Sequence, residues 1–324
     1  MRQSNALAEF HDLAPAEESF RDAVLAGLTR RAKSIPCRFL YDERGSALFE
    51  AICELPEYYL TRTEMAILGE FAPEMAEEAG RHAQLIEFGS GAARKVRLLL
   101  EALEEPAAYV AIDISRELLR RAADEVAADF PEVPVVAVCA DYTQPLRLPA
   151  LPARGEGRRL GFFPGSTIGN FTPDAAVEFL AGCRRVIGRG GALLIGVDLK
   201  KDAALLDAAY NDSAGVTAAF NLNLLERINR ELDADFDLDR FEHEAFYSAG
   251  SGRIEIYIRS RADQIVTVAG RAIRFAAGER IHTEDSCKYT VGEFQRLAAR
   301  GGFRPGRCWT DRDALFSVHL LEAG

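Results

Sequence analysis

The chain has 324 residues, of which 48% are hydrophobic and 27% charged, and its formal net charge is -11. This is enough apolar material for one large α/β domain or for two domains. An acidic chain without a long run of lysine and arginine argues against a nucleic-acid partner and favours small-molecule substrates. The first 20 residues carry charges throughout, and no segment reaches 18 uncharged apolar residues. We therefore expect a cytoplasmic protein with no membrane partner.

Cysteine and histidine are scattered along the chain without the spacings of a metal site. No Cys-x-x-Cys pair occurs, and the run Glu242-His-Glu244 is more typical of a solvated or sheet-edge strand. We predict reduced thiols, no disulfide framework and no metal. The six cysteines are Cys37, Cys53, Cys139, Cys183, Cys287 and Cys308.

Between residues 84 and 198, apolar strands alternate with helical patterns. This βαβ alternation predicts a doubly wound parallel sheet, in which strands buried on both faces are nearly continuous apolar runs. The predicted strands are 84–88, 108–112, 133–138, 160–163 and 192–197, and the predicted helices are 95–103, 116–128 and 174–187.

After residue 200 the pattern changes to that of an α+β insertion. The chain then returns to a helix and a closing pair of strands. Residues 1–61 show no sheet pattern of their own, and we expect them to pack on the insertion. The predicted helices are 203–210, 216–232 and 291–300, and the predicted strands are 241–247, 253–259, 264–268, 272–275, 303–310 and 316–322.

The first predicted strand runs into a glycine-containing loop, with the sequence QLIEFGSGAARK at residues 84–95. Gly89 and Gly91 allow a tight turn and a close backbone approach to a ligand, but the third glycine of a dinucleotide fingerprint is absent. Glu87 precedes the glycines, where a carboxylate suits the sulfonium and amino group of S-adenosylmethionine better than a pyrophosphate. A methyltransferase is the leading hypothesis, and a structural turn is the alternative.

Polar residues follow the next strands as well. Ligands of doubly wound sheets bind outside the carboxyl ends of the strands. Asp113 lies where a carboxylate binds ribose hydroxyls, and Asp141 could accept from an adenine amino group with Tyr142 beside the ring. Each aspartate could instead cap a helix, and Lys95 could be an ordinary solvated side chain. Their occurrence at successive strand ends favours a ligand site.

Five blocks of sequence resemble the ergothioneine-pathway histidine Nα-methyltransferases, which make trimethylhistidine from histidine and S-adenosylmethionine. The resemblance covers nearly the whole chain, and five blocks in the right order are far more specific than one glycine loop. The blocks are FLYDERGS at 39–46, LPEYYLTRTE at 55–64, FPGSTIGN at 163–170, AGVTAAFN at 214–221 and EDSCK at 284–288.

This resemblance implies a class I methyltransferase fold, a Rossmann-like doubly wound sheet with an inserted α+β substrate-recognition domain. Residues 62–198 plus 287–324 would form the S-adenosylmethionine-binding domain, and residues 1–61 plus 199–286 the recognition domain. The product of the cofactor would be S-adenosyl-L-homocysteine. With the loop residues above, the cofactor-binding set is Glu87, Gly89, Gly91, Lys95, Asp113, Asp141 and Tyr142.

The resemblance also implies how the backbone of an amino-acid substrate would be bound. Asn170 and Tyr210 would hold the carboxylate, and both are neutral donors that do not repel the substrate ammonium. Tyr41 and Phe49 would lie near the α-amine, with Gly165 offering close backbone approach. These three form the predicted catalytic set, in the sense of contact with the reacting amine.

Tyr58, Glu284 and Ser286 would contact the imidazole ring, whose nitrogens need one acceptor and one donor when the ring is neutral. The family pattern commonly has methionine where this chain has Ile256 and tryptophan where it has Tyr257. The branched Ile256 would alter the shape of the substrate site more than its polarity. Alternatively, Tyr58 and Tyr210 could be half-buried aromatics with a solvated hydroxyl, and Phe49 plain core. Asn170 could cap a helix, and Glu284 with Ser286 could form one exposed face of a strand.

Three other functions remain open from the sequence. The same chemistry on another aromatic amino acid, such as tryptophan, has only Ile256 in its favour. A dinucleotide-dependent oxidoreductase shares the glycine loop and Asp113 but lacks the third glycine. A cofactor-binding sensor without catalysis is the third. The expected substrate is a small molecule, the amino acid L-histidine, and the protein is expected to be a monomer.

Overall fold

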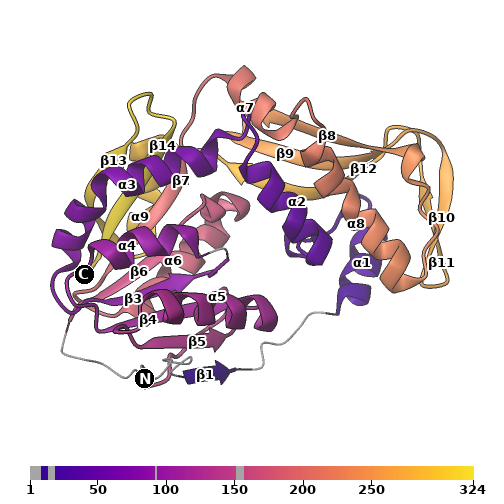
Figure 1. The fold of residues 1–324 in the computed structure, drawn as a ribbon. Helices are drawn as coiled ribbons and strands as arrows, with labels where there is room; N and C mark the ends of the chain where they lie inside the picture. Colours follow the sequence, from indigo (N-terminus) through magenta and orange to yellow (C-terminus); the bar gives the residue numbers. More distant parts are fainter. Residues whose placement is uncertain (1–8, 14–18, 92, 151–156) are drawn as a thin grey trace. The chain divides into compact units, whose positions relative to one another are not determined.

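The computed structural model describes residues 9–13, 19–91, 93–150 and 157–324. The chain folds into two compact units, which are described separately below, and Figure 1 labels their elements. Unit 1 contains the described residues of Met1–Ala16, Arg62–Leu199 and Tyr289–Gly324, and unit 2 those of Glu17–Thr61 and Lys200–Lys288. Among the described residues, no helix is long and apolar enough to cross a membrane.

Unit 1 is built on a sheet of eight strands among its described residues. The strands are β1 (Glu9–Asp12), β3 (Gln84–Phe88), β4 (Ala108–Asp113), β5 (Val135–Cys139), β6 (Arg159–Phe163), β7 (Ala192–Asp198), β13 (Phe303–Thr310) and β14 (Phe316–Ala323). Their order is β1-β5-β4-β3-β6-β7-β14-β13. In this order, each strand from β1 through β5, β4, β3 and β6 to β7 is parallel to its neighbour. Strand β14 is antiparallel to both β7 and β13. The order reverses beside β3, which is where such sheets bind ligands.

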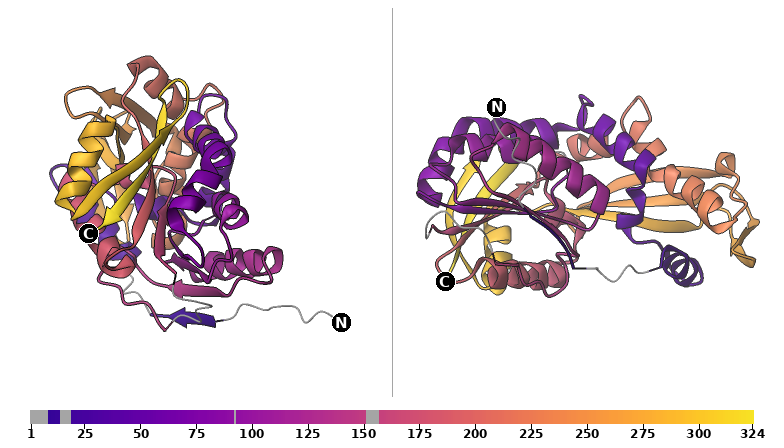
Figure 2. Two further views of the ribbon diagram at one scale, coloured as in Figure 1. Left: turned by 90° about the vertical axis from the view of Figure 1, so that its left-hand side faces the viewer. Right: turned by 60° about the horizontal axis from the view of Figure 1, so that its bottom comes forward.

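Helices cover both faces of this sheet. In Figure 2, α3, α4 and α5 lie on one face, and α6 and α9 lie on the other. The central strands are therefore buried along their whole length, as their apolar sequences predict. The helices are α3 (Tyr59–Ala79, in unit 1 from Arg62 on), α4 (Arg94–Ala102), α5 (Arg116–Asp129), α6 (Pro173–Ile187) and α9 (Val291–Arg300), and the short 3-10 turn η2 is Thr167–Asn170.

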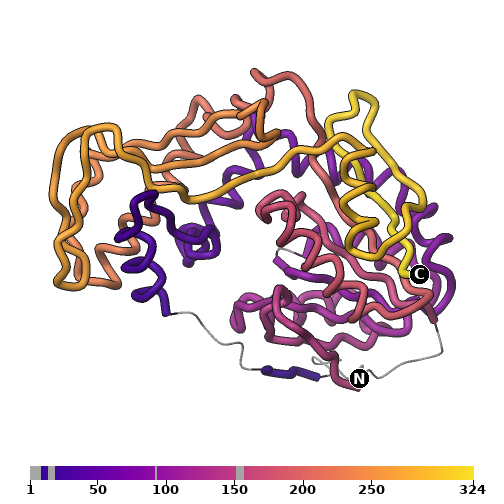
Figure 3. The backbone as a smooth tube through the Cα atoms, turned by 180° about the vertical axis from the view of Figure 1, so that it is seen from behind, coloured from indigo at the N-terminus to yellow at the C-terminus, as the bar shows by residue number. Residues whose placement is uncertain are grey.

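Unit 2 combines a four-stranded sheet, of order β2-β12-β9-β8, with a separate hairpin, β10-β11, and several helices. Figure 3 shows the long strands of the sheet and the hairpin beyond their ends. The strands are β2 (Lys33–Ser34), β8 (Phe241–Ser248), β9 (Arg253–Ser260), β10 (Gln264–Val268), β11 (Arg271–Phe275) and β12 (Arg280–Cys287). The helices are α1 (Phe20–Leu28), η1 (Cys37–Leu40), α2 (Glu43–Cys53), α7 (Ala203–Tyr210), α8 (Val216–Leu232) and η3 (Leu238–Arg240).

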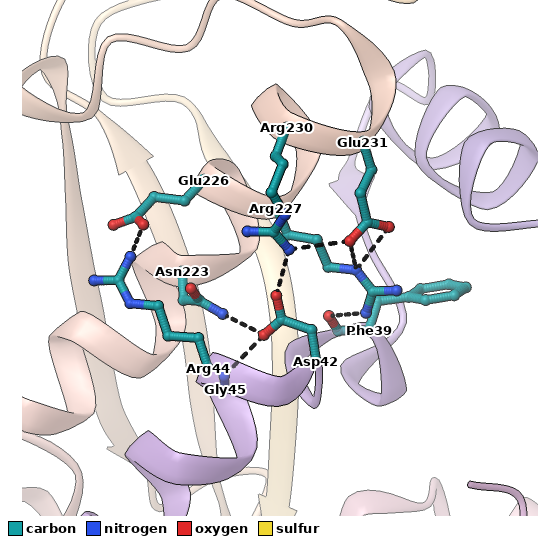
Figure 4. Close-up of polar contacts among 9 residues, drawn as sticks. All are labelled: Phe39, Asp42, Arg44, Gly45, Asn223, Glu226, Arg227, Arg230 and Glu231. Carbon is teal, nitrogen blue, oxygen red and sulfur yellow. Dashed lines mark hydrogen bonds and ion pairs between the residues drawn. The ribbon is translucent and has the colours of Figure 1, made fainter. Parts of the chain in front are cut away.

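Helix α8 holds the segment between η1 and α2 in place (Figure 4). Asp42 caps α2 by accepting from the N–H of Gly45 at 2.8 Å, and it also accepts from Asn223 and Arg230 of α8, each at 2.7 Å. The pKa of Asp42 is lowered. Partial burial acts to raise it, but these hydrogen bonds together lower it by more. The neighbouring residue Tyr41 is thereby fixed against α8.

The predicted elements between residues 84 and 198 are confirmed, with ends that differ by at most two residues. The insertion helices 203–210 and 216–232 and the closing elements after residue 290 are confirmed as well. Three strands were not predicted. Strands β1 and β2 have only four and two residues, too few to show alternation, while β12 carries the polar run Glu284–Ser286 and a register shift between His282 and Glu284.

Strand β1 also corrects one expectation about the N-terminal segment. Residues 1–61 were expected to pack on the insertion as part of the recognition domain. Instead, Glu9–Asp12 pairs in parallel with β5 and extends the sheet of unit 1, with Asp12 opposite Cys139. An edge strand needs only backbone groups and a free sheet edge to pair, so its sequence carries little signal.

Candidate functional site

The carboxyl ends of β4 and β5 bring two predicted aspartates close together in unit 1. Asp113 lies opposite Cys139 in the sheet, and its carbonyl accepts from the N–H of Ala140 at 2.9 Å. The Asp113 carboxylate accepts from the N–H of Ser115 at 2.8 Å. Burial raises the pKa of Asp113, and backbone hydrogen bonds offset part of that shift. Asp113 thus stabilises the start of α5 and also lies at the strand end where a ligand site was predicted.

Asp141 and Tyr142 follow the neighbouring strand end. Asp141 accepts from the N–H and the hydroxyl of Thr143, at 2.8 and 2.6 Å. The ring of Tyr142 packs edge-on against Phe163, with ring centroids 5.8 Å apart. Gly89 has a φ of 79°, and a Cβ there would lie 3.5 Å from the Tyr142 ring. The glycine loop and Tyr142 therefore lie next to each other.

Glu87 is buried in β3, where the hydroxyl of Tyr109 donates to its carboxylate. Burial raises the pKa of Glu87 to about 7, although the hydrogen bond from Tyr109 and the charge of Lys95 act in the opposite direction. A cationic ligand beside Glu87 would favour its ionised form. The group is therefore a carboxylate whose charge responds to a ligand near neutral pH.

Lys95 is part of an ion pair rather than an ordinary solvated side chain. Its ammonium lies 2.5 Å from the carboxylate of Glu64, which is 1% exposed, and both carboxylate oxygens accept from the N–H of Gly165 at 2.9 Å. A Cβ at Gly196 would lie 2.0 Å from this carboxylate, so β7 leaves room for it only with glycine. Glu64 lies in one of the five sequence blocks, but no role for it was predicted.

Ser90 is a second residue that the sequence analysis missed. It lies between the two loop glycines and is 1% exposed, and its hydroxyl has no hydrogen-bond partner among the described residues. Buried hydroxyls are normally paired, so a ligand in the loop would supply the missing partner. By contrast, no described atom lies near a Cβ built at Gly91, so space alone does not require glycine there. The residues present fit a polar, partly cationic ligand such as S-adenosylmethionine.

Unit 2 gathers most of the predicted substrate-site aromatics in one cluster. The ring centroid of Tyr41 lies 5.5 Å from that of Phe49 and 5.4 Å from that of Phe220. The ring centroids of Phe49 and Tyr58 are 6.4 Å apart. Tyr58 in turn lies 6.1 Å from Tyr210. Phe220 was missed: it stands in the block at 214–221, but its contact with Tyr41 depends on the packing of α8 against α2.

A hydroxyl pair and a lysine adjoin this cluster. The hydroxyl of Tyr210 donates to Ser286 at 3.0 Å, and the ammonium of Lys288 donates to Tyr210 at 2.8 Å and to Ser286 at 2.9 Å. All three side chains are buried. Lys288 ends the block at 284–288, and the sequence analysis gave it no role.

Glu284 lies on the same face of the sheet as Ser286. In the register of β12 with β9, Glu284 pairs with Ile256 and Ser286 pairs with Ile254. Burial raises the pKa of Tyr58 well above its usual range, and the nearby Tyr210, Cys53, Tyr41 and Glu284 raise it further. Glu284 is therefore close enough to Tyr58 to influence it. These contacts bring Tyr58, Tyr210, Glu284 and Ser286 into one region of unit 2.

Only one of the two departures from the family pattern lies on that face. Ile256 is 4% exposed and shares the face of Glu284, whereas Tyr257 points to the opposite face. There Tyr257 stacks on Phe246, with ring centroids 6.0 Å apart, and donates to Glu255 at 2.8 Å. A change at Tyr257 therefore acts on the outer surface of the sheet.

The acidic–histidine run at 242–244 is a strand at the edge of the sheet, as predicted. Strand alternation places His243 on the inner face, where its Nε2 lies 2.9 Å from the carbonyl of Tyr210. Burial lowers the pKa of His243. Glu242 and Glu244 lie on the outer face, where they form ion pairs with Arg259 and Arg280.

The predicted site residues thus fall into two sets, each within one unit. The first set also includes Asn170, the last residue of η2, which follows β6. The set of unit 1 is Glu87, Gly89, Gly91, Lys95, Asp113, Asp141, Tyr142, Gly165 and Asn170. The set of unit 2 is Tyr41, Phe49, Tyr58, Tyr210, Ile256, Glu284 and Ser286.

Comparisons with known proteins give the family. A family model described as histidine-specific methyltransferase, SAM-dependent, matches residues 20–323. The chain is 42% identical to the histidine N-alpha-methyltransferase of Mycolicibacterium smegmatis, over 97% of this chain and 98% of that protein. It is 41% identical to that of Mycobacterium tuberculosis, over 93% and 94%. It is 36% identical to ergothioneine biosynthesis protein 1 of Neurospora crassa, over 89% of this chain and 33% of that protein.

The parallel sheet with its antiparallel final strands, and the carboxylates at the strand ends, are those of a class I methyltransferase that uses S-adenosylmethionine. The chain belongs to the histidine-specific methyltransferase family. It is an enzyme, and its substrate is a small molecule.

Proposed function

We propose that the enzyme transfers three methyl groups from S-adenosylmethionine to the α-amine of L-histidine. The product is Nα,Nα,Nα-trimethylhistidine, or hercynine, and the reaction is the first step of ergothioneine biosynthesis. The observation that carries this proposal is the family match over residues 20–323. It is supported by a single carboxylate, Glu284, on the sheet face that also carries Ser286, close to Tyr58 and Tyr210. Such a set suits a ring that has both an N–H and an acceptor nitrogen.

We assign cofactor binding to the residues of unit 1. When bound, S-adenosylmethionine supplies a methyl group made electrophilic by its sulfonium. Glu87 would contact its ammonium, and Lys95 its carboxylate. Asp113 would accept from the ribose hydroxyls and Asp141 from the adenine amino group. The glycine loop with Gly89 and Gly91, the hydroxyl of Ser90, which has no partner among the described residues, and the ring of Tyr142 would complete the site.

We assign the substrate backbone to neutral donors and aromatic rings. Asn170 and Tyr210 would hold the carboxylate without a side-chain cation beside the amine. The amine must be neutral to attack, and each attack creates a positive charge at nitrogen. Tyr41, 38% exposed, would accept a hydrogen bond from the amine and pass protons to water. The faces of Tyr41 and Phe49 would stabilise the growing methylammonium by cation–π attraction.

The chemistry asks little of acid–base groups, because positive charge is moved rather than created. Catalysis would then rest on alignment and on exclusion of water. Gly165 would allow the substrate amine to approach the backbone closely, since glycine carries no side chain. Its N–H is fixed by Glu64, so this loop is held before substrate arrives.

The first experiment is a competition among amino acids. The purified protein is incubated with S-adenosylmethionine and an equimolar mixture of histidine, tryptophan, tyrosine and phenylalanine, and products are identified by mass spectrometry. We expect a gain of three methyl groups on histidine alone. Methylation of tryptophan instead would contradict the substrate and direct attention to Ile256, and binding of cofactor without any turnover would contradict the proposed activity.

Replacing Glu284 by alanine tests the ring contact directly. The variant should lose its preference for histidine over phenylalanine, since the ring N–H would lack its acceptor. Asp285→Ala is the matched control, because Asp285 pairs with Glu255 across β9, on the opposite face of the sheet. An unchanged ranking of substrates in Glu284→Ala would contradict the assignment.

We also propose that the enzyme is a cytoplasmic monomer that binds no nucleic acid. No disulfide joins any of the six cysteines, all of which lie among the described residues, and this suits a reducing compartment. Light scattering coupled to size-exclusion chromatography tests the monomer. A dimer at micromolar concentration would contradict it.

A further inference from the structure

Tyr109 places a phenol beside the buried carboxylate of Glu87. Tyr109 is 1% exposed and Glu87 is 4% exposed, and the phenol donates to the carboxylate. In the register of β3 with β4, Glu87 pairs with Ala111, so Tyr109, Ala111 and Glu87 lie on the same face of the sheet. Because the side chain of Ala111 is small, the ring of Tyr109 can extend past it to the diagonal position on β3. The contact is therefore built into the register of two buried strands.

The phenol of Tyr109 favours the ionised form of Glu87. Burial and the charge of Glu87 raise the pKa of Tyr109 well above its usual range, so the phenol keeps its proton. An ionised carboxylate has only acceptor oxygens, which suit a donor such as this phenol. A hydrogen bond to an ionised acceptor is also stronger than one to a neutral group. The contact therefore stabilises the ionised carboxylate of Glu87 more than the protonated one.

Charged groups on three other elements or strand ends also act on Glu87. Lys95 of α4 favours its ionised form, whereas Asp113 at the end of β4 and Glu64 of α3 disfavour it. Burial disfavours the ionised form most strongly. The ammonium of Lys95 is shared, since it also forms the ion pair with Glu64. Among the groups that favour ionised Glu87, Tyr109 has the largest effect.

We propose that Tyr109 is a positioning residue for the cofactor, because its phenol holds the Glu87 carboxylate in the place and the charged state that a cationic ligand requires. The inference rests on the proposed function, in which Glu87 contacts the ammonium of S-adenosylmethionine. Tyr109 does not need to touch the cofactor. Without the phenol, binding would have to remove a proton that Glu87 holds more tightly. The phenol thus sets the pH range over which the cofactor binds well.

The test removes the hydroxyl and keeps the ring, in Tyr109→Phe. Calorimetry measures the affinity for S-adenosylmethionine between pH 6 and pH 9, and the readout is the ratio of wild-type to variant affinity, which cancels any titration of the cofactor itself. The pH midpoint of binding should rise by about one pH unit in the variant. The ratio should then be about tenfold at pH 6, about fivefold at pH 7 and close to one at pH 9. A ratio that is the same at every pH would indicate a merely structural role and overturn the proposal.

Two further variants test whether Tyr109 acts through Glu87. In Glu87→Gln the group no longer titrates, so adding Tyr109→Phe should not make the affinity depend on pH. A pH-dependent effect of Tyr109→Phe that persists in the Glu87→Gln background would overturn the proposed route. Tyr289→Phe is the matched control, because it removes another buried phenol of unit 1. Its ratio should stay close to one, and the same dependence on pH in Tyr289→Phe would also overturn the proposal.

A measurement without ligand separates this inference from the proposed function. Carbon-13 NMR of the glutamate side-chain carboxyls, with the Glu87 signal identified by its absence in Glu87→Gln, follows the titration of Glu87 in the ligand-free protein. We expect a midpoint near pH 7 in the wild type and about one pH unit higher in Tyr109→Phe. An unchanged midpoint would overturn the proposal.

The two measurements together show which idea fails. If the midpoint shifts but the affinity for S-adenosylmethionine does not vary with pH, the proposed contact between Glu87 and the cofactor is wrong, whereas the effect of Tyr109 on Glu87 stands. If Tyr109→Phe does not fold, Tyr109→Met undergoes the same two measurements with the same expected shift, since methionine adapts to irregular space and carries no hydroxyl.

Discussion

The two units of the molecule place their functional groups in different ways. In unit 1 the groups are ionisable and stand at strand ends: Glu87 in β3, Asp113 at the end of β4 and Asp141 just after β5. In unit 2 they are mostly rings and hydroxyls from helices and loops, together with Glu284 and Ser286 on one face of a sheet and the buried Lys288. Parallel strand ends converge by topology alone, whereas a ring cluster needs several elements to pack together. Unit 1 is suited to a charged ligand, and unit 2 to discrimination by shape.

The largest effect should come from breaking the buried ion pair of unit 1. Glu64→Ala leaves the ammonium of Lys95 and the N–H of Gly165 without their shared acceptor. We expect the free energy of unfolding to fall by about 3 kcal/mol, because removing one partner leaves a largely buried charge. Chemical denaturation measures the loss. Glu77→Ala, at an exposed position of the same helix, should change it by less than about 0.5 kcal/mol. An equal decrease in the free energy of unfolding in Glu64→Ala and Glu77→Ala would contradict a special role for Glu64.

Glu87 should make cofactor binding depend on pH. Its pKa is about 7 in the folded protein, above its model-compound value of 4.5. Protonated Glu87 must lose its proton to bind a cation, so affinity should weaken about tenfold per pH unit below pH 7 and level off above it. Calorimetry in buffers of different ionisation enthalpy would detect one proton released at pH 6.

The same shift has a consequence for folding, and a variant separates the two effects. Since the folded state binds this proton more tightly, the contribution of Glu87 favours folding below pH 4.5 and is lost as pH rises to about 7. Glu87→Gln should abolish both pH dependences. A pH-dependent affinity that persists in Glu87→Gln would assign the titration to another group.

A smaller effect is expected in the ring cluster of unit 2. Phe49→Leu keeps an apolar side chain but removes the π face beside Tyr41. Cation–π attraction should matter most for the trimethylated nitrogen, because it cannot lose a proton and keeps its positive charge. The third methylation should therefore slow about fivefold more than the first. Single-turnover mass spectrometry of each methylated intermediate gives the ratio. Phe39→Leu, a buried ring that packs on Phe20, is the control, and equal slowing of all three steps in Phe49→Leu would contradict the idea.

The smallest effect is expected on substrate preference, from substitutions at Ile256 and Tyr257, the two residues that depart from the family pattern. Ile256→Met, on the face of Glu284, should change the ratio of kcat/KM for histidine and tryptophan by about threefold, since the two side chains have similar volume. Tyr257→Trp, on the opposite face, should leave that ratio unchanged. The competition assay described above measures both. A larger effect from Tyr257→Trp would contradict the division of faces.

Much of unit 1 could be predicted from the sequence because its signals are local. Continuous apolar runs, glycine turns and aspartates after strands gave both the strands and their functional ends. The missed residues depend on distant partners. Glu64 lies on α3, yet its role comes from Lys95 on α4 and from Gly165 after β6. Ser90 became informative only when its buried hydroxyl proved to have no hydrogen-bond partner in the part of the chain that the structure describes.

Unit 2 could be predicted less directly. Its helices α7 and α8 and its strands β8 to β11 followed from periodicity, whereas α1 and α2 were not predicted. Its site residues came from a resemblance to a family rather than from the pattern of residues. Strand β12, which carries Glu284 and Ser286, was not predicted, because a register shift interrupts the alternation of its side chains. The N-terminal strand β1 was placed with the wrong domain for a related reason: edge pairing depends on backbone groups, which every sequence has.

The sequence by itself determined the class of fold, the family and the chemistry of the reaction, since these depend on local periodicity and on short blocks that fold in place. Only the tertiary structure decided which side chains form ion pairs or hydrogen bonds with each other and which lie on the same face of a sheet. Lys288 donates a hydrogen bond to Tyr210, which is distant along the chain, and the pleat of strand β9 places Ile256 and Tyr257 on opposite faces. Contacts between distant residues depend on the packing of whole elements, and no short stretch of sequence records that packing.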